Sequence, residues 1–519
     1  MARISWMDAL KDKAKNLVSE RVQESQHAQG KLTAQERIDL LLDKGSFTEI
    51  GAFATLQSHE YDLQKKKEER DGVITGFGRI DGRQVFVYSQ DFTFMGASMG
   101  EMHTRKIAHV IELAMKTGSP VIGLLDSGGA RIQEGIDGLD GGGEIFKKNT
   151  LASGMVPQIS AVMGPCAGIA VYSPALTDFI IMTQATATML ITGPNVVKSV
   201  TGETISMRDL GGAEVHNRVS GVAHFLTVDD KHAVELIRNL ISYLPLNNLE
   251  DPPIVSTNDP YNRLNSSLEE IVPDKSTVVY NVKAVLQEVL DRGSILEVHE
   301  HWAANVVVGF GRLNGHAIGF VANQPMVLAG SIDIDASDKI ARFVNFCDAF
   351  NIPIINFVDV SGFLPGSNQE HGGIIRHGAK VLFAYSQATV PKISLVMRKA
   401  YGGAYIALVS KDMGFDKVVA WPFAEIAVMG AEGAVSIVNR KQLKDAEQGS
   451  RIKQKLIDEY TERFLNPYVA AAKNKVDIII EPKETRKTLI NLLEMLLPKR
   501  GDMDAKIPMK YKKHGSMPV

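Results

Sequence analysis

The 519-residue chain has little cysteine, no long hydrophobic run and no marked excess of charge of one sign. Its two cysteines, Cys166 and Cys347, exclude a disulfide framework and a four-cysteine zinc site, and free thiols fit a reducing compartment. No apolar run reaches the roughly 20 residues that a membrane-spanning helix needs. Residues 1–17 lack a signal-peptide core, and Asp8 and Asp12 argue against a transit peptide. We therefore expect a cytoplasmic protein that begins with an amphipathic surface helix and has no membrane partner.

The charge balance also narrows the function. Lysine and arginine number 57 and aspartate and glutamate number 60, so the formal net charge is −3. Without a basic excess, the chain is not expected to bind nucleic acid. Its 45% hydrophobic and 23% charged residues are ordinary for a soluble globular protein. At this length, more than one domain is expected.

The sequence repeats itself once. The segment GFGRIDG begins at Gly76 and GFGRLNG begins at Gly309, an offset of 309 − 76 = 233. The same offset carries Asp126, in LLDSGG, onto Asp359, in FVDVSG. It also carries Lys106-Ile107-Ala108 onto Lys339-Ile340-Ala341 and Pro120 onto Pro353. Residues 244–275, rich in proline and short polar residues, separate the copies as a linker. We predict two duplicated domains, at residues 1–255 and 265–519.

Each copy predicts the same order of elements. Two β-rich runs flank Asp81-Gly82 in the first copy and Asn314-Gly315 in the second, which predicts a hairpin in each. A helix follows at roughly 104–117 and 337–350, with Thr104 and Ser337 as caps. An apolar strand comes next and ends in a glycine-rich loop. Apolar strands that alternate with helices favour an α/β fold with a largely parallel, buried sheet.

Two loops of small residues follow apolar strands at nearly equivalent places. They are GPCAGIA at 164–170 and AYGGAY at 400–405, and 403 − 168 = 235. Small residues at a strand-to-helix turn leave backbone N–H groups uncovered, and these can bind an oxyanion. In a single copy, tight turns would explain the glycines equally well, but two copies favour a pair of oxyanion holes. Cys166 has no evident activating neighbour, so we interpret it as a packing residue.

Carboxyl transfer between two carbonyl compounds is a reaction that uses two such holes without a strong side-chain base. One hole would stabilise the enolate of a thioester, and the other would hold the ureido oxygen of a carboxylated carrier. The ureido nitrogen that loses the carboxyl group can take up the proton of the acceptor.

The longest motifs resemble one enzyme family. They are DSGGARIQEG (126–135), GPCAG (164–168), YSPALTDFIIM (172–182), SGFLPG (361–366), GGIIRHGAK (372–380), RKAYGGAY (398–405) and AWPFAEIAVMGAEGAV (420–435). From about residue 30 onward, the chain is similar to the biotin-dependent acyl-CoA carboxyltransferases, the beta subunits of propionyl-CoA and acetyl-CoA carboxylases. The resemblance implies two crotonase-like (ClpP/crotonase) domains, the N-terminal one binding acyl-CoA and the C-terminal one binding biotin. It also implies a homo-hexamer in which each active site forms between domains of different subunits.

The resemblance assigns the site residues. The first hole maps onto Gly168 and Ile169, and the second, which would also bind biotin, onto Gly403 and Ala404. The neighbouring Ala167 and Gly402 are expected to contact substrate. Many relatives have a second glycine where this chain has Ile169, a departure that keeps the N–H group of the hole.

Ile406 stands where similar propionyl-preferring enzymes often carry aspartate, at a position that lines the acyl pocket. Isoleucine there predicts that acetyl-CoA is accepted as well as propionyl-CoA. The alternative is that Ile406 only packs on a helix face.

The resemblance also implies partners. The chain carries neither an ATP-binding module nor a biotin attachment site, so a biotin carboxylase and a biotin carboxyl carrier protein are expected on other chains, and no metal is expected in this one. The carboxyltransferase subunit of a methylmalonyl-CoA decarboxylase or of a transcarboxylase would look almost the same. A biotin-independent hydratase or isomerase of the crotonase type would instead need acid/base carboxylates near the thioester, for which Asp126 and Glu134 are the candidates.

Overall fold

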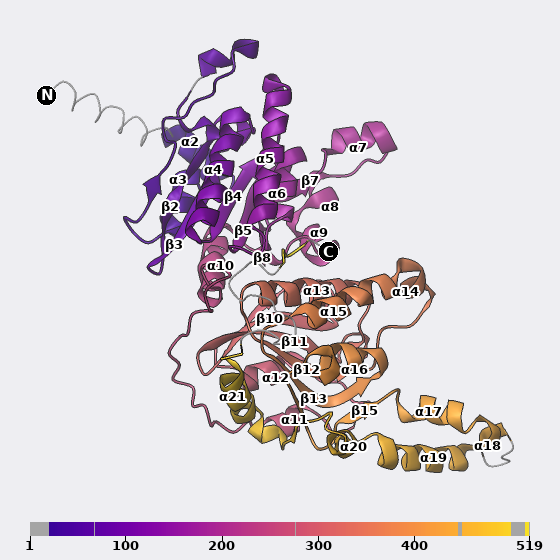
Figure 1. Ribbon diagram of the computed structural model, residues 1–519. Coiled ribbons are helices and arrows are strands. Elements are labelled where there is room, and N and C mark those ends of the chain that lie inside the picture. Colours follow the sequence, from indigo (N-terminus) through magenta and orange to yellow (C-terminus); the bar gives the residue numbers. More distant parts are fainter. Residues whose placement is uncertain (1–19, 67, 276, 445–448, 500–513, 518–519) are drawn as a thin grey trace. The chain divides into compact units, whose positions relative to one another are not determined.

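The computed structural model describes residues 20–66, 68–275, 277–444, 449–499 and 514–517. The chain divides into two compact units, each described here by itself (Figure 1). Unit 1 ends at Glu250 and also holds residues 514–517, and unit 2 begins at Asp251. The change from one unit to the next lies within the proline-rich residues 244–275. The surface helix expected at residues 1–17 lies outside the described residues.

Unit 1 is built on an eight-stranded sheet in the order β1-β2-β3-β4-β5-β6-β8, with β7 paired to β5. The strands are β1 (Thr48–Glu49), β2 (Val73–Ile80), β3 (Arg83–Gln90), β4 (Val121–Ser127), β5 (Gln158–Ala167), β6 (Phe179–Thr183), β7 (Thr188–Leu190) and β8 (Phe225–Thr227). Pairing is antiparallel from β1 to β3 and parallel from β3 onward. The helices are α2 (Glu20–Ala28), α3 (Ala34–Leu41), α4 (Glu101–Thr117), α5 (Ile136–Ala152), α6 (Tyr172–Ala175), α7 (Pro194–Thr201), α8 (Met207–Gly211), α9 (Ala213–Arg218) and α10 (Asp230–Tyr243).

Unit 2 repeats this architecture, with an eight-stranded sheet in the order β9-β10-β11-β12-β13-β14-β16 and β15 paired to β13. The strands are β9 (Leu296–Val298), β10 (Val306–Leu313), β11 (His316–Asn323), β12 (Ile354–Val360), β13 (Lys392–Tyr401), β14 (Lys417–Ala420), β15 (Glu425–Ala427) and β16 (Ile478–Ile479). The helices are α11 (Leu268–Ile271), α12 (Val282–Val289), α13 (Ile334–Ala349), α14 (Ser367–Gly372), α15 (Ile374–Gln387), α16 (Gly402–Val409), α17 (Ala431–Val438), α18 (Arg440–Lys444), α19 (Gly449–Phe464), α20 (Pro467–Ala472) and α21 (Thr485–Leu496). The matching strand orders confirm the predicted duplication and the α/β class. Among the described helices, none is long and apolar enough to cross a membrane.

The predicted hairpins are present in both units. Asp81-Gly82 and Asn314-Gly315 form the turns, and both residues of each pair have positive φ. Each turn is held by one carboxylate, since Asp43 accepts both backbone N–H groups of the first turn at 3.1 and 2.8 Å. Asp291 accepts the two N–H groups of the second turn at 3.0 and 2.8 Å. The local sequence therefore fixes the register of the first two long strands in each unit.

The two predicted helix starts are wrong by one turn, because α4 begins at Glu101 and α13 at Ile334. Thr104 and Ser337 are not caps. Their hydroxyl groups donate to the backbone carbonyl four residues earlier, at 3.0 and 2.7 Å. In unit 2 the true N-cap is Asp333, whose carboxylate accepts a backbone N–H at 2.9 Å. Hydroxyl residues serve both at caps and inside a first turn, which explains the error.

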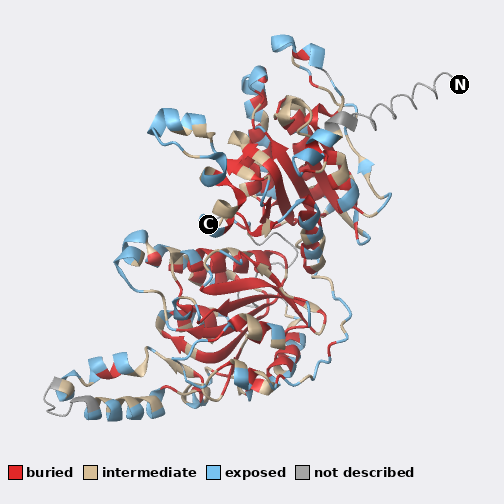
Figure 2. Ribbon diagram, turned by 180° about the vertical axis from the view of Figure 1, so that it is seen from behind, coloured by how far each residue is buried: buried red, intermediate tan, exposed pale blue. Residues whose placement is uncertain are grey.

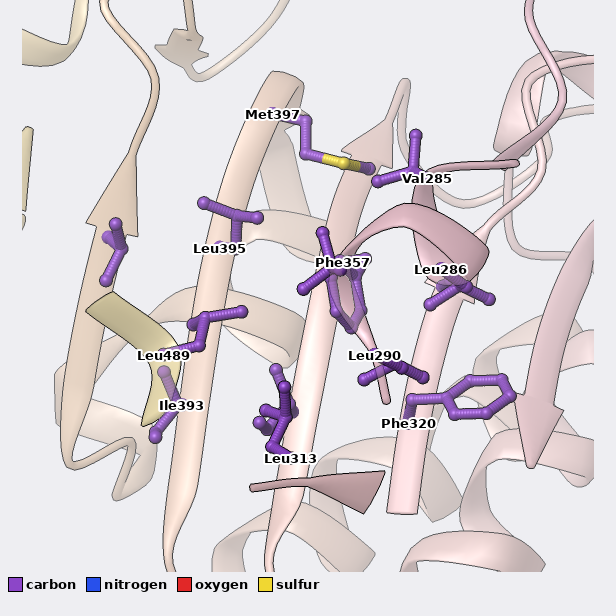
Figure 3. Close-up of a cluster of buried hydrophobic side chains, with 14 of the residues drawn as sticks. Val285, Leu286, Leu290, Leu313, Phe320, Phe357, Ile393, Leu395, Met397 and Leu489 are labelled. Carbon is purple, nitrogen blue, oxygen red and sulfur yellow. The ribbon is translucent and has the colours of Figure 1, made fainter. Parts of the chain in front are cut away.

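The core of each unit lies on its sheet, and the central strands are buried along their whole length (Figure 2). In unit 2, Phe320, Phe357, Leu395 and Met397 project from neighbouring strands into one apolar cluster (Figure 3). Strands covered on both faces were predicted from the continuous apolar runs, and this is confirmed. Such strands position the loops at their ends rigidly.

Candidate active site

The two loops of small residues leave equivalent strands. In unit 1, β5 runs into a short 3-10 helix, Gly168–Val171, and in unit 2, β13 runs into α16. The sheet ladder pairs Ser127 with Cys166 in unit 1. It pairs Val360 with Ala400 in unit 2. Since 360 − 127 = 233 and 400 − 166 = 234, unit 2 has one extra residue between these strands.

This register corrects the alignment of the loops by one residue. Gly168 corresponds to Gly402, not to Gly403, and Ile169 corresponds to Gly403. The backbone agrees, because Gly168 has φ 59° and Gly402 has φ 56°. Glycine adopts this left-handed conformation at less cost than other residues, so both positions favour glycine where the chain turns from strand into helix.

The helical turns that start at these glycines lack side-chain caps. Neither Ala167 nor Tyr401, the N-cap residues, accepts a backbone N–H through a side chain. The first N–H groups of a helix have no partner within it, and they carry the positive end of the helix dipole. Both turns are therefore suited to hold an oxygen that gains negative charge.

The predicted site residues gather at these two turns. Gly403 is exposed, Ala167, Gly168, Ile169 and Gly402 are partly exposed, and Ala404 is buried. Ile406 follows on α16, and its residue is 48% exposed, so it does not fill the core of unit 2. Each turn thus presents at least one residue with accessible backbone.

Next to the first turn, the strand-end carboxylate is buried and ion-paired. The Nζ atom of Lys31 lies 2.8 Å from Oδ2 of Asp126, and Arg37 lies 3.4 Å from the same oxygen. Burial, together with the nearby charge of Asp126, raises the pKa of Cys166 to about 12. The thiol stays protonated at neutral pH, in keeping with a packing role.

Glu134 is held just as firmly. One of its oxygens accepts from Arg131 at 2.8 Å, and the other accepts the backbone N–H of Glu101 at 2.7 Å. Arg131 is completely buried and also binds Asp71 at 2.7 Å. Neither of the two candidate acid/base carboxylates, Asp126 and Glu134, is thus a free base. Within the described part of the chain, no group of three or more histidine, cysteine, aspartate or glutamate side chains is placed to hold a metal ion.

The corresponding carboxylate of unit 2 is neutralised from another element. The guanidinium of Arg398, on β13, lies 2.9 Å from Oδ2 of Asp359. Arg398 corresponds to Gly164 of unit 1, where a Cβ atom would lie only 2.0 Å from Oδ1 of Asp126. Near the second turn, the hydroxyl of Tyr401 donates to Glu425. Burial and the Glu425 carboxylate raise the pKa of Tyr401, so its hydroxyl remains a donor.

Sequence reasoning missed two residues that contact the turns. A Cβ atom at Gly403 would lie 3.7 Å from the ring of Phe363, which belongs to the SGFLPG motif. The side chain of Ile169 packs on Gly142 of α5. Phe363 lies 403 − 363 = 40 residues before Gly403 in the chain, so the sequence around either residue does not reveal the contact.

Comparisons with known proteins agree with this geometry. The carboxyl transferase domain family matches residues 25–508. The chain is 56% identical over 495 residues to the propionyl-CoA carboxylase carboxyltransferase subunit of Haloferax mediterranei, covering 95% of both proteins. It is 53% identical over 497 residues to methylmalonyl-CoA decarboxylase subunit alpha of Veillonella parvula, covering 96% of this chain and 95% of that protein.

A solved structure extends the match to three dimensions. The transcarboxylase 12S structure, described as a hexamer assembly with methylmalonyl-coenzyme A bound, has a TM-score of 0.95 and 49% identity. The alignment covers 100% of this chain and 98% of that one. This likeness confirms the predicted crotonase-like fold. The chain therefore belongs to the carboxyl transferase family, as its motifs predicted, and it is a carboxyltransferase enzyme.

Proposed function

We propose that the chain is the carboxyltransferase (beta) subunit of a biotin-dependent acyl-CoA carboxylase. It moves the carboxyl group from carboxybiotin to the α carbon of propionyl-CoA, and also of acetyl-CoA, giving methylmalonyl-CoA or malonyl-CoA. The observation that carries this proposal is the occurrence, once in each unit, of the same uncapped helix start behind a left-handed glycine.

The two turns divide the work. In unit 1, the N–H groups of Gly168 and Ile169 stabilise the enolate oxygen of the thioester. In unit 2, the N–H groups of Gly403 and Ala404, each one position further along the turn than its counterpart in unit 1, hold the ureido oxygen. Carboxybiotin supplies the carboxyl group and, once that group has left, a nitrogen that can accept the α proton. Removing one such N–H donor typically costs about 10²–10³ in turnover, so each turn is worth several kcal/mol of transition-state stabilisation.

The ion pairs argue against a hydratase or isomerase of the crotonase type. That chemistry needs positioned acid/base carboxylates, and Asp126 and Glu134 are tied to Lys31 and Arg131. Carboxyl transfer needs no side-chain base, because the leaving group takes the proton. The arrangement supports the transferase over this alternative.

The acyl group and the partners complete the proposal. The exposed Ile406 lines the acyl pocket and admits both acetyl and propionyl groups. The enzyme works as a homo-hexamer with a biotin carboxylase and a biotin carboxyl carrier protein on other chains. The solved transcarboxylase 12S core is a hexamer, which supports the assembly. The two free, buried cysteines support a cytoplasmic location.

A second candidate has a specific observation in its favour. The identity to the methylmalonyl-CoA decarboxylase subunit is 53%, almost as high as that to the carboxylase subunit. In such a complex, or in a transcarboxylase, the same carboxyl transfer would run with other partners. Purification of the native complex distinguishes the carboxylase from the decarboxylase, since it would contain a biotin carboxylase in the first case and a membrane decarboxylase subunit in the second.

The reverse half-reaction tests the proposal directly. Purified protein is mixed with methylmalonyl-CoA or malonyl-CoA, with and without free biotin, and the acyl-CoA products are separated by chromatography. We expect biotin-dependent loss of the carboxyl group from both. Loss from methylmalonyl-CoA alone would remove the role of Ile406, and no turnover by a folded hexamer supplied with carrier protein would refute the proposed function.

A further inference from the structure

A second loop borders each turn, and its hydrogen bonds are the same in both units. In unit 1, the N–H of Met99 donates to Gly129 at 2.8 Å, and the N–H of Arg131 donates back to Met99 at 2.9 Å. In unit 2, the same two bonds join Ile332 to its neighbours, from Ile332 to Gly362 at 3.0 Å and from Leu364 to Ile332 at 2.8 Å. The residue between them is Ala130 in unit 1 and Phe363 in unit 2, so these two positions are equivalent.

In unit 2, the ring of Phe363 fills the space between two helices. A Cβ atom at Gly378, on α15, would lie 3.1 Å from Cε1 of the ring. A Cβ atom at Gly403, on α16, would lie 3.7 Å from Cδ2 and Cε2, on the opposite edge. The ring therefore rests on the backbone of α15 and supports the start of α16. Glycine at 378 makes room, because real Cβ atoms rarely come as close as 3.1 Å to a rigid ring.

In unit 1, the corresponding space next to α5 is filled by a side chain of the turn itself, and not by the neighbouring loop. Ala130 is too short to reach the covering helix. Instead, Ile169, which corresponds to Gly403, packs on α5. A Cβ atom at Gly142 would lie 3.3 Å from Cδ1 and 3.6 Å from Cβ of Ile169. Each unit thus has one small and one large residue at these two positions, in opposite order. In unit 1 the loop has Ala130 and the turn has Ile169, whereas in unit 2 the loop has Phe363 and the turn has Gly403.

We propose that Ile169 and Phe363 are equivalent positioning residues, each a wedge that fixes one oxyanion turn against its covering helix. This inference rests on the proposed function and assigns the wedges to different substrates. In unit 2, the wedge comes from the neighbouring loop, so Gly403 carries no side chain and a flat ureido ring can approach its N–H group beside Phe363. In unit 1, the wedge is on the turn itself, which a slender thioester tolerates.

The kinetic consequence is that each truncation should affect the kinetic constants for one substrate, biotin or methylmalonyl-CoA, much more than those for the other. Truncation of Phe363 to alanine loosens only the second turn, so kcat/KM for free biotin should fall by on the order of tenfold or more, because small misplacements of reacting groups are costly. The KM for methylmalonyl-CoA should stay within about twofold. Ile169→Ala should show the reverse pattern. Phe363→Leu, which keeps much of the wedge, should recover most of the loss.

The experiment measures decarboxylation of methylmalonyl-CoA by the whole protein while each substrate is varied in turn. Phe383→Ala is the matched control, because it removes an exposed aromatic ring from α15, the helix on which the ring of Phe363 rests. Thermal unfolding of each variant shows whether it is folded. A folded Phe363→Ala variant that keeps its kcat/KM for free biotin, or whose KM for methylmalonyl-CoA rises as much as its KM for biotin, would overturn the inference. Absence of turnover in the unmodified protein would instead refute the proposed function.

A stability measurement tests the wedge independently of activity. Gly142→Ala should destabilise the unmodified protein, because the new methyl group meets Ile169. In an Ile169→Ala background, the same substitution should be neutral or stabilising, as alanine is the better helix former. Equal effects of Gly142→Ala in both backgrounds would show that Ile169 does not rest on α5 and would overturn the proposal for unit 1.

Discussion

The assignment of the second oxyanion turn can be tested at Gly403, because this glycine is not needed for folding. Its φ lies outside the left-handed region that Gly402 occupies. A Cβ atom there would meet only the ring of Phe363, at 3.7 Å, which is an ordinary van der Waals contact. Valine is slightly better than glycine inside a helix, so the change in unfolding free energy of a Gly403→Val variant should stay within about 1 kcal/mol.

The expected effect on turnover is far larger. Valine keeps the backbone N–H of residue 403 but places a branched side chain where the ureido group must approach. A donor that the ureido oxygen cannot reach is lost to catalysis, and the loss of one oxyanion-hole donor costs about 10²–10³ in turnover, or about 2.7–4 kcal/mol. Biotin-dependent decarboxylation of methylmalonyl-CoA should therefore fall by at least about a hundredfold, while the melting temperature stays nearly constant. Gly403→Ala should give an intermediate loss.

Gly143→Ala provides the matched control. Gly143 lies on the exposed face of α5, and a Cβ atom there would have no neighbour within 4 Å. This variant should be as active as the unmodified protein. Normal turnover of a folded Gly403→Val variant would refute the oxyanion assignment, since no other role of Gly403 requires the absence of a side chain.

Three further predictions address the first turn, the acyl pocket and the buried histidine. Gly168→Ala should lower both turnover and stability, the latter by about 1–2 kcal/mol in thermal or urea unfolding, because residue 168 has a left-handed φ of 59°. Ile406→Asp should raise the ratio of kcat/KM for propionyl-CoA over acetyl-CoA, measured with reconstituted partners, and an unchanged ratio would dismiss Ile406 as a selector. Burial, followed by the charge of Arg131, lowers the pKa of His103 to about 3, and Gln90 and a backbone carbonyl occupy both ring nitrogens. The unfolded chain therefore binds the extra proton, so unfolding free energy should fall as the pH drops from about 6.5 toward 3, and less steeply in His103→Gln.

The sequence predicted those features that are encoded locally or repeated. The hairpin turns need only Asp81-Gly82 and Asn314-Gly315, and the duplication follows from a constant offset. The first turn of α4 was misplaced because Thr104 bonds back to a carbonyl instead of capping, which the residue type alone does not reveal. The loop alignment was one residue off because the extra residue of unit 2 lies in the connection between β12 and β13.

The contacts around the turns needed the structure for a different reason. That Ile169 rests on Gly142, and Phe363 on Gly378, depends on side chains from loops and helices that are distant in sequence. In a single sequence, Ile169 looks like an isolated departure. The structure shows that Ile169 lies against α5 much as Phe363 lies against α15, so the small residue at position 130 in unit 1 is matched by a large one at position 169.

Asp126 and Asp359, the carboxylates at the ends of β4 and β12, show which contacts of the site are the same in both units and which differ. The parallel ladder is interrupted at Asp126 and at Asp359, directly before the glycine-rich loops. In both units, the backbone N–H of this aspartate donates to a side-chain amide oxygen. The acceptor is Gln90 in unit 1, at 3.1 Å, and Asn323 in unit 2, at 3.3 Å, and these two residues are also 233 positions apart.

The cation that neutralises the carboxylate, by contrast, has moved. Lys31 and Arg37 approach Asp126 from outside the sheet, whereas Arg398 reaches Asp359 from the neighbouring strand. A buried carboxylate must be paired, but the pairing charge can come from any direction that leaves room for it. The interruption of the ladder next to each proposed oxyanion turn, with an amide oxygen bound to the aspartate N–H, is therefore the feature that both units share. The counter-ion is the feature that differs between the units, since Arg398 lies on the neighbouring strand and Lys31 does not.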